Sequence, residues 1–342
     1  MNVCLIAPQV IKAVSGGLST QVENTSYYLN KLGVKVTFYN QWEVYDWNKF
    51  DLAHVFRADY ETFNMARFLH ESSIPFAVSP VFYNLNNKFI IRLYLKLSNI
   101  LQLVFKGFRS DFDYLHQISK LSSRLLPNTL SEAEFMNYCL GVEDKKISVI
   151  PNGVETRFKD ADPSQFMKKY GLKDFILTVG NLGNNRKNIL SLLKALEKID
   201  HPSVIIGKFN NTIYGSQCMD MVKRNKHIIW IDALAHDDPL LESAYAACKV
   251  FVLPSFFETP GIAALEAALT GANIVITPYG GTNEYFQEMA EYVNPRNIIS
   301  IRDGIIQALS KKRNLTLQKH VIDNYTWPIV AQKTLSAYKN VI

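Results

Sequence analysis

Short apolar runs alternate with longer amphipathic stretches in the first half of the chain. An apolar run at residues 3–7 precedes an amphipathic stretch at residues 20–32, and further short runs lie at residues 34–39, 52–56 and 76–78. Strands joined by helical crossovers give this alternation. We therefore expect a parallel sheet with helices covering both of its faces.

A second set of apolar runs predicts a second domain of the same kind. Its members are residues 175–179, 204–206, 228–231, 250–253, 274–276 and 292–293. The turn-forming Pro151-Asn152-Gly153 interrupts the pattern between the two sets. The fold class we expect is α/β, with two doubly wound, Rossmann-like domains at residues 1–155 and 156–322. Residues 323–342 contain an amphipathic helix with Pro328 in its first turn.

The placement of ligands in such folds suggests where a site would lie. Ligands of open parallel sheets bind beyond the carboxyl ends of the strands. We therefore expect the two domains to face each other across a cleft, with functional residues in the loops that follow the strands.

Composition allows two cores and limits the classes of partner. The 342 residues are 48% hydrophobic and 20% charged, and the formal net charge is +6. A positive balance favours nucleic acid, an acidic membrane surface or phosphorylated small molecules. Nucleic-acid binding needs clustered cations with exposed aromatic side chains on one face, whereas the cations here are scattered outside residues 88–109. We therefore expect no nucleic-acid partner.

The N-terminal segment and the cysteines indicate a cytoplasmic protein. The apolar run at residues 3–7 is too short, and too uncharged at its start, for a signal peptide. Cys4, Cys139, Cys218 and Cys248 lie far apart without paired spacing, so we expect neither a zinc cluster nor a disulfide framework. The expected location is the cytoplasm, with the inner face of the membrane as an alternative.

Two glutamates lie around a predicted helix start after the apolar run at residues 250–253. Pro260 and Gly261 suit the start of a helix, whose first amides have no internal partner and attract anions. Glu258 and Glu266 would then lie roughly 10 to 12 Å apart, too far to act as a hydrolytic pair on one bond. They suit opposite ends of one long ligand, such as a nucleotide-sugar. Two solvated helix glutamates are the structural alternative.

Two further loops carry candidate phosphate-binding features. Gly16-Gly17 follows the first predicted strand, where glycines allow close approach of a ligand to the backbone, and a tight turn is the alternative. The three-glycine pattern of a nicotinamide-binding loop is missing. Arg186 and Lys187 follow the run at residues 175–179 and precede a predicted helix at 189–196. They could stabilise a diphosphate leaving group or belong to a solvated basic turn.

With these features in order, the chain resembles a known family. Residues 254–261, with the sequence PSFFETPG, continue through Leu265-Glu266-Ala267 to Gly271. This segment resembles the signature of retaining glycosyltransferases with the GT-B fold, glycosyltransferase family 4. Pro151-Asn152-Gly153 also matches the turn that joins the two domains in that family.

The resemblance implies how a nucleotide-sugar donor would be held. Glu258 would face the donor sugar, Glu266 would bind the ribose hydroxyls, and Arg186 and Lys187 would contact the phosphates. The remaining donor contacts would come from the helix start after Glu258 and from the Gly16-Gly17 turn. The residues are Thr259, Gly261, Ile262, Ala263 and Gly17. The resemblance further implies a front-face mechanism with no metal and no cofactor besides the donor substrate.

The resemblance also assigns roles to whole regions. Residues 156–322 would form the donor side, residues 1–155 the acceptor side with Gly16 near the acceptor, and residues 323–342 would pack back on the N-terminal domain. Relatives often carry a donor-contacting histidine in the strand that here covers residues 76–83, but no histidine occurs there. Tyr83 is a candidate substitute.

Three further features of the sequence bear on the predicted site. His54 ends an earlier strand and is a second candidate for contact with the sugar or acceptor, with a structural histidine as the alternative. The family often has an arginine at the position of Asn181, which leaves Arg186 or Lys187 to do more. Asp111-Phe112-Asp113 is similar to the metal-binding Asp-x-Asp of another glycosyltransferase architecture, but lacks further oxygen ligands nearby, so we interpret it as chance.

Residues 88–109 form a cationic, aromatic-rich stretch. It is too interrupted by charge to span a bilayer, yet such a helix can lie in a membrane interface or bind a long acceptor. Packing of an ordinary helix in the core is the alternative.

Together with these patterns, the resemblance implies a retaining glycosyltransferase. It would move a sugar from a UDP- or GDP-linked donor to a glycan, a lipid-linked acceptor or another hydroxyl. The alternatives are a nucleotide-sugar epimerase or hydrolase of the same build and a catalytically inactive, glycosyltransferase-like binding protein.

Overall fold

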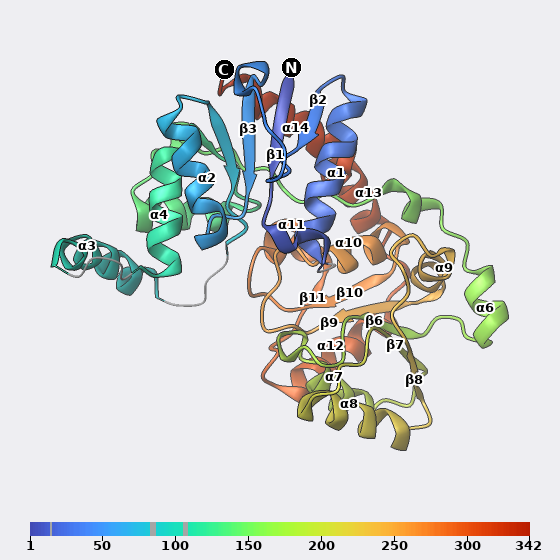
Figure 1. The fold of residues 1–342 in the computed structure, drawn as a ribbon. Helices are drawn as coiled ribbons and strands as arrows, with labels where there is room; N and C mark the ends of the chain where they lie inside the picture. The colour runs from blue at the N-terminus through green and yellow to red at the C-terminus, as the bar shows by residue number, and fades with distance from the viewer. Residues whose placement is uncertain (14–15, 83–86, 105–108) are drawn as a thin grey trace. The chain divides into compact units, whose positions relative to one another are not determined.

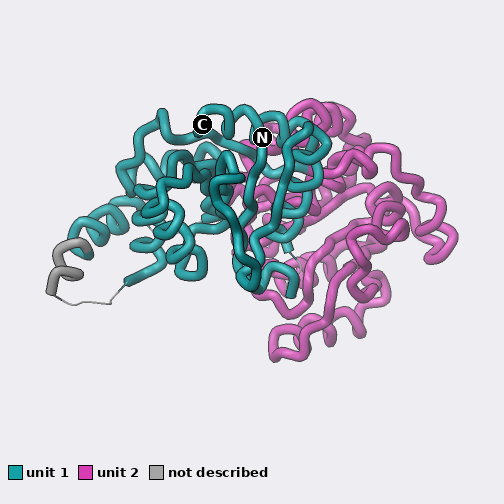
Figure 2. The backbone as a smooth tube through the Cα atoms, turned by 45° about the horizontal axis from the view of Figure 1, so that its top comes forward, with its two compact units in different colours: residues 1–153, 327–342 teal, residues 154–326 magenta. Residues whose placement is uncertain are grey.

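The chain folds into two compact units in a computed structural model. The structure describes residues 1–13, 16–82, 87–104 and 109–342, without the side chains of residues 99–104. Residues 1–153 and 327–342 form the N-terminal unit, and residues 154–326 form the C-terminal unit (Figure 2). Each unit is an α/β domain around one parallel sheet, as the sequence predicts.

The N-terminal unit contains a five-stranded parallel sheet in the order β2-β1-β3-β4-β5 (Figure 1). Its strands are β1 (Asn2–Ile6), β2 (Lys35–Phe38), β3 (Leu52–Phe56), β4 (Phe76–Ser79) and β5 (Arg124–Leu125). Its helices are α1 (Gly17–Lys31), α2 (Tyr60–Glu71), α3 (Lys88–Val104), α4 (Asp111–Leu121), α5 (Leu130–Leu140) and α14 (Trp327–Lys339).

The C-terminal unit contains a six-stranded parallel sheet in the order β11-β10-β9-β6-β7-β8. Its strands are β6 (Ile176–Val179), β7 (Ser203–Ile206), β8 (Ile228–Ile231), β9 (Val250–Leu253), β10 (Asn273–Ile276) and β11 (Glu291–Tyr292). Its helices are α6 (Ser164–Tyr170), α7 (Ile189–Leu196), α8 (Ile213–Arg224), α9 (Pro239–Ala247), α10 (Ile262–Leu269), α11 (Thr282–Phe286), α12 (Ile298–Ser310) and α13 (Leu315–Tyr325).

Alternation along each strand divides the core into two layers per unit. In β1, Val3 and Leu5 pack in the cluster that contains residues of α1 and α14, whereas Cys4 and Ile6 pack in the cluster that contains residues of α2 to α5. In the C-terminal unit the two faces of β9 divide in the same way between α9, α10 and α13 on one side and α7, α8 and α12 on the other. Burial on both faces explains why these strands appear as continuous apolar runs.

The unit boundary differs slightly from the predicted one, and its position has a packing reason. The chain passes between units at residues 153/154 and 326/327, where the Val154 amide donates to the carbonyl of Tyr325 at 2.8 Å. A Cβ on Gly153 would lie 2.5 Å from the Trp327 ring, so this glycine lets the ring pack against the backbone. Trp327, rather than residue 323, therefore begins the returning tail, because α13 packs on α10 of the C-terminal unit.

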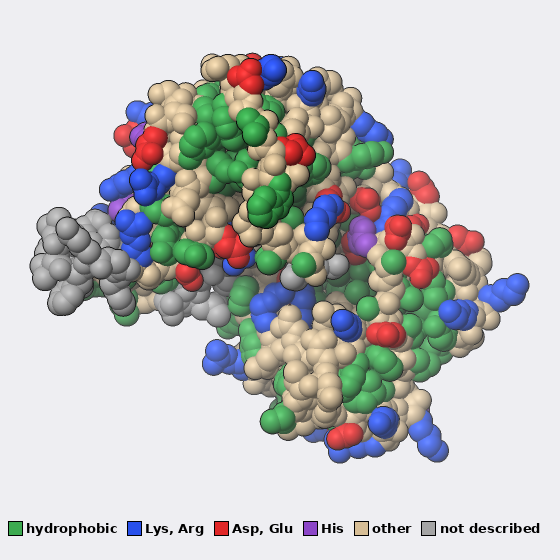
Figure 3. Space-filling model, viewed as in Figure 1, with side chains coloured by type: hydrophobic (Ala, Val, Ile, Leu, Met, Phe, Trp, Pro, Cys, Tyr) green, Lys and Arg blue, Asp and Glu red, His purple; other side chains and the backbone are tan. Residues whose placement is uncertain are grey.

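Polar and hydrophobic side chains are mixed on the surface. In the view of Figure 3, hydrophobic side chains of the N-terminal unit form patches between charged ones. None of the described helices has the length and apolar character needed to cross a bilayer.

Candidate functional site

The loop that carries Arg186 and Lys187 follows β6 and is fastened to the loop after the neighbouring strand β9. Both side chains lie in a short 3-10 helix, η5 (Asn185–Lys187). The Arg186 carbonyl accepts from the Phe256 amide at 2.9 Å. Buried Asn188 donates from Nδ2 to the carbonyls of Pro254 at 3.0 Å and Pro295 at 2.6 Å. These bonds hold the basic loop against the residues that lead to Glu258.

Glu258 lies in one cluster with Arg186 and Lys187, although it follows them by more than 70 positions in the chain. Arg186 Nη1 lies 3.0 Å and Lys187 Nζ 2.6 Å from Oε1 of Glu258. Arg186 Nη1 also donates to the Phe257 carbonyl at 2.9 Å. The Glu258 side chain is 7% exposed, whereas that of Arg186 is 35% exposed. The structure thus brings together three of the residues that the sequence predicts for one site.

The two cations keep Glu258 ionised. Burial alone would raise the pKa of this carboxyl, but attraction to Lys187 and Arg186 and the hydrogen bond from Lys187 outweigh it and hold the pKa below its ordinary value. One carboxylate between two cations leaves a local excess of positive charge. Such a cluster can accept a polyanion.

The backbone around Glu258 is fixed by the turn after β10. The Glu258 amide donates to the Tyr279 carbonyl, and the Gly281 amide donates to the Glu258 carbonyl, each at 3.0 Å. Gly280 lies between them with φ of 109°, and a Cβ there would lie 1.9 Å from the Glu258 carbonyl oxygen. Only glycine fits this position. The turn therefore sets where the carboxylate lies.

The start of α10 follows Glu258 and Thr259 directly. Gly261 caps the helix with φ of 84°, in the left-handed region that glycine tolerates. The amides of Gly261, Ile262 and Ala263 are the first of the helix, and helices leave such amides without internal acceptors. Ile262 and Ala263 are half-buried. A helix start beside two cations is suited to an anionic group.

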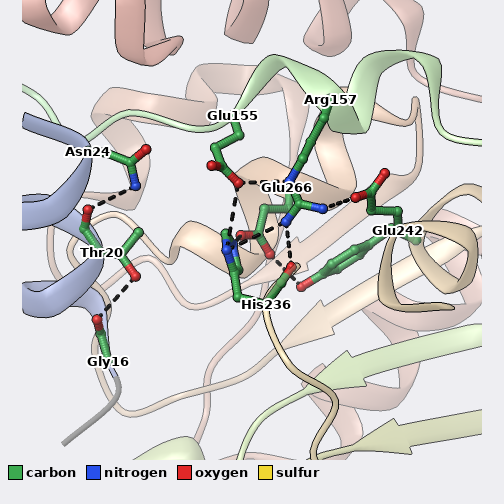
Figure 4. Close-up of polar contacts among 9 residues, drawn as sticks. Gly16, Thr20, Asn24, Glu155, Arg157, His236, Glu242 and Glu266 are labelled. Carbon is green, nitrogen blue, oxygen red and sulfur yellow. Dashed lines mark hydrogen bonds and ion pairs between the residues drawn. The ribbon is translucent and has the colours of Figure 1, made fainter. Parts of the chain in front are cut away.

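Glu266 lies inside α10, as predicted, and this buried carboxylate takes part in a network of polar side chains that includes the exposed His236 (Figure 4). Its Oε1 lies 2.8 Å from His236 Nε2, and its Oε2 accepts from the Tyr245 hydroxyl at 2.7 Å. His236 Nδ1 lies 3.6 Å from Glu155, and Arg157 bridges Glu155 and Glu242. The carboxylate is held in place from both sides.

Sequence reasoning did not find His236, Arg157 or Tyr245. His236 follows β8 in the stretch Leu234-Ala235-His236-Asp237, and a single histidine after a predicted strand was the signal available. Glu266 raises the pKa of His236 above its ordinary value by hydrogen bonding, and burial only partly offsets this. Glu266 therefore shifts the equilibrium of His236 toward its imidazolium form.

Gly16 and Gly17 lie at the start of α1 in the N-terminal unit. The Gly16 carbonyl accepts from the hydroxyls of Ser19 at 2.8 Å and Thr20 at 3.2 Å. A Cβ on Gly16 would meet no described atom within 4 Å. Packing of the described residues therefore does not require glycine at this position.

His54 is a structural residue, which corrects its assignment as a contact for sugar or acceptor. Its ring nitrogens lie 2.6 Å from the Tyr338 hydroxyl and 2.9 Å from the Ser79 hydroxyl, and the residue is 2% exposed. Burial lowers the pKa of His54 to about 3. A neutral, buried imidazole with both nitrogens engaged is not presented to a ligand. Tyr83, the other candidate for this role, lies outside the described residues.

Asp113 also has a structural role. Its carboxylate accepts hydrogen bonds from Tyr94 at 2.8 Å, from Ser98 at 2.5 Å and from the amide and hydroxyl of Ser110, each at 2.8 Å. It therefore anchors the start of α4 to α3. Across the described ranges no group of three or more His, Cys, Asp or Glu side chains could hold a metal ion.

A cavity of about 550 Å³ lies in the N-terminal unit beyond the carboxyl ends of β1 and β2. Its lining includes the aromatic side chains of Phe38, Tyr39 and Trp42. It also includes the amides of Gln9 and Gln41, which bond to each other at 2.5 Å. The combination of aromatic faces and amides suits a polar organic ligand.

Part of the chain is similar to known glycosyltransferases. Residues 173–311 match the family model described as "Glycosyl transferases group 1". An uncharacterised glycosyltransferase of Methanocaldococcus jannaschii is 30% identical over 216 residues, which cover 57% of this chain and 54% of that protein. The O-antigen chain mannosyltransferase B of Escherichia coli is 26% identical over 51% of this chain and 48% of its own. The chain thus spans about half the length of the curated relatives it matches.

Solved structures share the fold along nearly the whole chain. A sucrose-phosphate synthase from Thermosynechococcus elongatus has a TM-score of 0.77 at 15% identity, with 99% of this chain and 98% of that chain covered. HepE from Anabaena, in complex with UDP and glucose, has a TM-score of 0.68 at 14% identity, with 99% of each chain covered. These likenesses show the two-domain, Rossmann-like α/β fold of GT-B glycosyltransferases.

Proposed function

We propose that this protein is a retaining glycosyltransferase of family 4 that transfers a sugar from a UDP- or GDP-linked donor to a hydroxyl acceptor. The observation that carries the proposal is the cluster of Arg186, Lys187 and Glu258 beside the start of α10. A nucleotide-sugar has a diphosphate for the cations and amides and a sugar for the carboxylate. Its ribose, at the other end, matches Glu266 on the same helix.

Each donor contact follows from the chemistry of its residue. Arg186, Lys187 and the amides of Gly261, Ile262 and Ala263 would hold the diphosphate, with Thr259 and Gly17 as further contacts. Glu266, held by His236 and Tyr245, would accept hydrogen bonds from the ribose hydroxyls. Anabaena HepE, which shares the fold, was crystallised with UDP and glucose and gives this proposal a parallel.

The reaction we propose is a front-face transfer without a metal. The bond between the anomeric carbon and the diphosphate breaks while the acceptor oxygen attacks from the same face. The acceptor hydroxyl gives its proton to the departing phosphate oxygen. Lys187 and Arg186 neutralise the charge that develops on the diphosphate, which is where fixed cations lower the barrier. Glu258 orients the sugar.

The acceptor would bind through the N-terminal unit. Its cavity at the carboxyl ends of β1 and β2 combines aromatic side chains with amides, which suits the hydroxyls and ring faces of a carbohydrate or of the sugar end of a lipid-linked acceptor. Gly16, open to approach, would lie near the acceptor. We propose a role in polysaccharide or glycoconjugate biosynthesis, at a cytoplasmic location.

Thermal shift against a panel of uridine, guanosine and adenosine diphosphate sugars tests the donor assignment. A specific donor at about 100 times its Kd should stabilise the protein by roughly 2.7 kcal/mol, a shift of several degrees. Mass spectrometry of products from that donor and a mixture of carbohydrate acceptors then identifies the transfer.

Two variants test the roles of the residues. Glu266→Ala should weaken donor binding roughly tenfold or more, because a ribose contact is lost. Lys187→Ala should mainly slow transfer, because the charge it stabilises develops in the transition state. Unchanged transfer in both variants contradicts the site. Release of free or epimerised sugar without any acceptor product instead indicates the hydrolase or epimerase alternative.

A further inference from the structure

We propose that α3 binds an anionic lipid surface through one exposed face. The face consists of Phe89, Ile90, Leu93 and Leu97, with Arg92 and Lys96 along one side, and is called the α3 face below. This inference does not depend on the proposed glycosyl transfer. It uses only residues 88–98 of the helix and its neighbours.

Four large apolar side chains of α3 are exposed to solvent. Phe89 is 63% exposed, Ile90 62%, Leu93 48% and Leu97 49%. At about 100° per residue, they lie within an arc of roughly 100° on the helix. A monomeric surface usually carries such side chains singly, so four on one arc indicate an interaction surface.

Packing against the rest of the N-terminal unit accounts for a different arc of the same helix. Ile91, Leu95 and Ser98 are buried, and Ser98 donates to Asp113 at 2.5 Å. These residues lie roughly 180 to 240° around the helix from Phe89. The inward arc therefore explains why α3 is folded, and the outward apolar arc is left without a core to fill. Figure 1 shows α3 at the outer edge of its unit.

The charge of the α3 face selects the kind of partner. Lys96 and Arg92 lie roughly 20° and 60° from Phe89 along one side of the apolar arc. Lys88, four residues before Arg92, lies nearer the buried arc and pairs with Glu134 of α5 at 3.4 Å. The sequence contains no Asp or Glu from residue 87 to residue 110. An amphipathic helix with cations beside its apolar stripe is suited to the interface of an anionic bilayer, where acyl chains cover the stripe and headgroups pair with the cations.

The apolar surface continues from α3 onto α5. An open groove of about 830 Å³ lies between Phe89 and the α5 side chains Leu130 and Tyr138. Glu134, which pairs with Lys88, and Asp144 also line it. Leu130 is 60% and Tyr138 41% exposed, and the Arg92 guanidinium lies 4.8 Å from the Tyr138 ring centre. The cation and the aromatic ring thus stand together at the border of the groove. This pairing is typical of side chains at a membrane interface.

Co-sedimentation of the full chain with vesicles tests the proposal. One vesicle contains phosphatidylcholine alone and the other an equimolar mixture with phosphatidylglycerol. We expect binding to the mixed vesicles, weakened by high salt, and little binding to phosphatidylcholine. The double variant Arg92→Gln with Lys96→Gln should weaken binding roughly 10- to 30-fold, because each cation near an anionic surface contributes about tenfold or less. Ile90→Ser with Leu93→Ser should also weaken it severalfold.

Matched variants elsewhere separate the α3 face from net charge and general hydrophobicity. Lys168→Gln with Lys169→Gln removes the same charge from exposed positions of α6, and Ile213→Ser with Ile299→Ser removes exposed apolar side chains of the C-terminal unit. Both should bind vesicles like the unmodified protein. Absent vesicle binding, or equal loss in α3 and control variants, overturns the proposal. So does lipid-free self-association that the α3 variants abolish, which would assign the face to a second copy.

Discussion

At the scale of single residues, the candidate site consists of one buried carboxylate that forms ion pairs with two cations. Glu258 pairs with Arg186 and Lys187 in the absence of a donor, and both cations contact the same oxygen atom, Oε1. A diphosphate that binds to these cations must share them with Glu258. Under the proposed function, the carboxylate would therefore compete with the phosphates while it positions the sugar.

This competition predicts opposite effects of Glu258→Gln on two measurements. The neutral amide removes a negative charge near the diphosphate, so affinity for the nucleoside diphosphate should rise severalfold in calorimetric titration. Turnover of the nucleotide-sugar should fall roughly 100-fold, because the amide is a poorer acceptor for the sugar hydroxyls. Glu288→Gln, at an exposed position, serves as the control and should change neither value. A parallel loss of affinity and turnover contradicts the competition.

His236 gives the second residue-scale prediction, which concerns pH. Its pKa is raised above 6.5 in the folded protein, mainly by the hydrogen bond to Glu266, so its contribution to stability is fully present below pH 6.5. That contribution is lost as the pH rises through the folded pKa. Besides Glu266, the charged groups that face the ring are Glu155, which favours protonation, and Arg157, which opposes it.

The difference in Tm between the unmodified protein and His236→Asn should therefore shrink as the pH rises above 6.5. Differential scanning calorimetry across this range measures it. Glu266→Gln removes the main partner instead of the histidine, and the pH dependence should be smaller in that variant because only Glu155 still favours protonation. A Tm difference that stays constant with pH would show that His236 acts without its proton.

At the scale of elements, the parallel topology brings the site together. β6 and β9 are neighbours in the sheet, so the loops after their carboxyl ends lie side by side, and the turn after β10 holds the second of them. Gly280 is the residue on which this arrangement depends, because a Cβ would collide with the Glu258 backbone.

Gly280→Ala should therefore destabilise the protein by about 2–4 kcal/mol, from the contact and from the positive φ together. It should also lower turnover, because Glu258 must move. Urea unfolding and activity assays measure the two effects. Gly171→Ala is a matched control, since Gly171 has φ of 66° but no atom within 4 Å of an added Cβ. Gly171→Ala should lower the free energy of unfolding by only about 1 kcal/mol and leave turnover unchanged.

Local sequence patterns were sufficient to predict the fold and part of the candidate site. The apolar runs predict ten of the eleven strands in the described part of the chain because buried parallel strands are uninterrupted, while β5 has only two residues, Arg124 and Leu125. Glu258, Arg186 and Lys187 could be grouped because each follows a strand. His236 could not be linked to Glu266. The sequence could not decide between the ligand-binding and structural alternatives for His54, because its partner Tyr338 lies 284 residues away.

At the scale of the whole molecule, the tail belongs to the unit where the chain begins. Trp327, Val330, Ala337 and Tyr338 pack in a cluster with residues of β1 and β3. Trp327 and Tyr338 are almost fully buried, and Tyr338 also engages His54. The C-terminal unit has hydrophobic clusters of its own that consist of residues 154–321.

Removal of residues 327–342 should therefore unfold the N-terminal unit and spare the C-terminal one. Loss of a buried large aromatic side chain typically costs 3–5 kcal/mol, and two such losses are comparable with the stability of a whole domain. Hydrogen exchange followed by mass spectrometry should show β1 and β3 exchanging rapidly while β9 and β10 stay protected. A chain without Ile342 alone, an exposed residue, is the control and should exchange like the full chain. Equal loss of protection in β1 and β9 would mean that the two units unfold as one cooperative body, in spite of their separate cores.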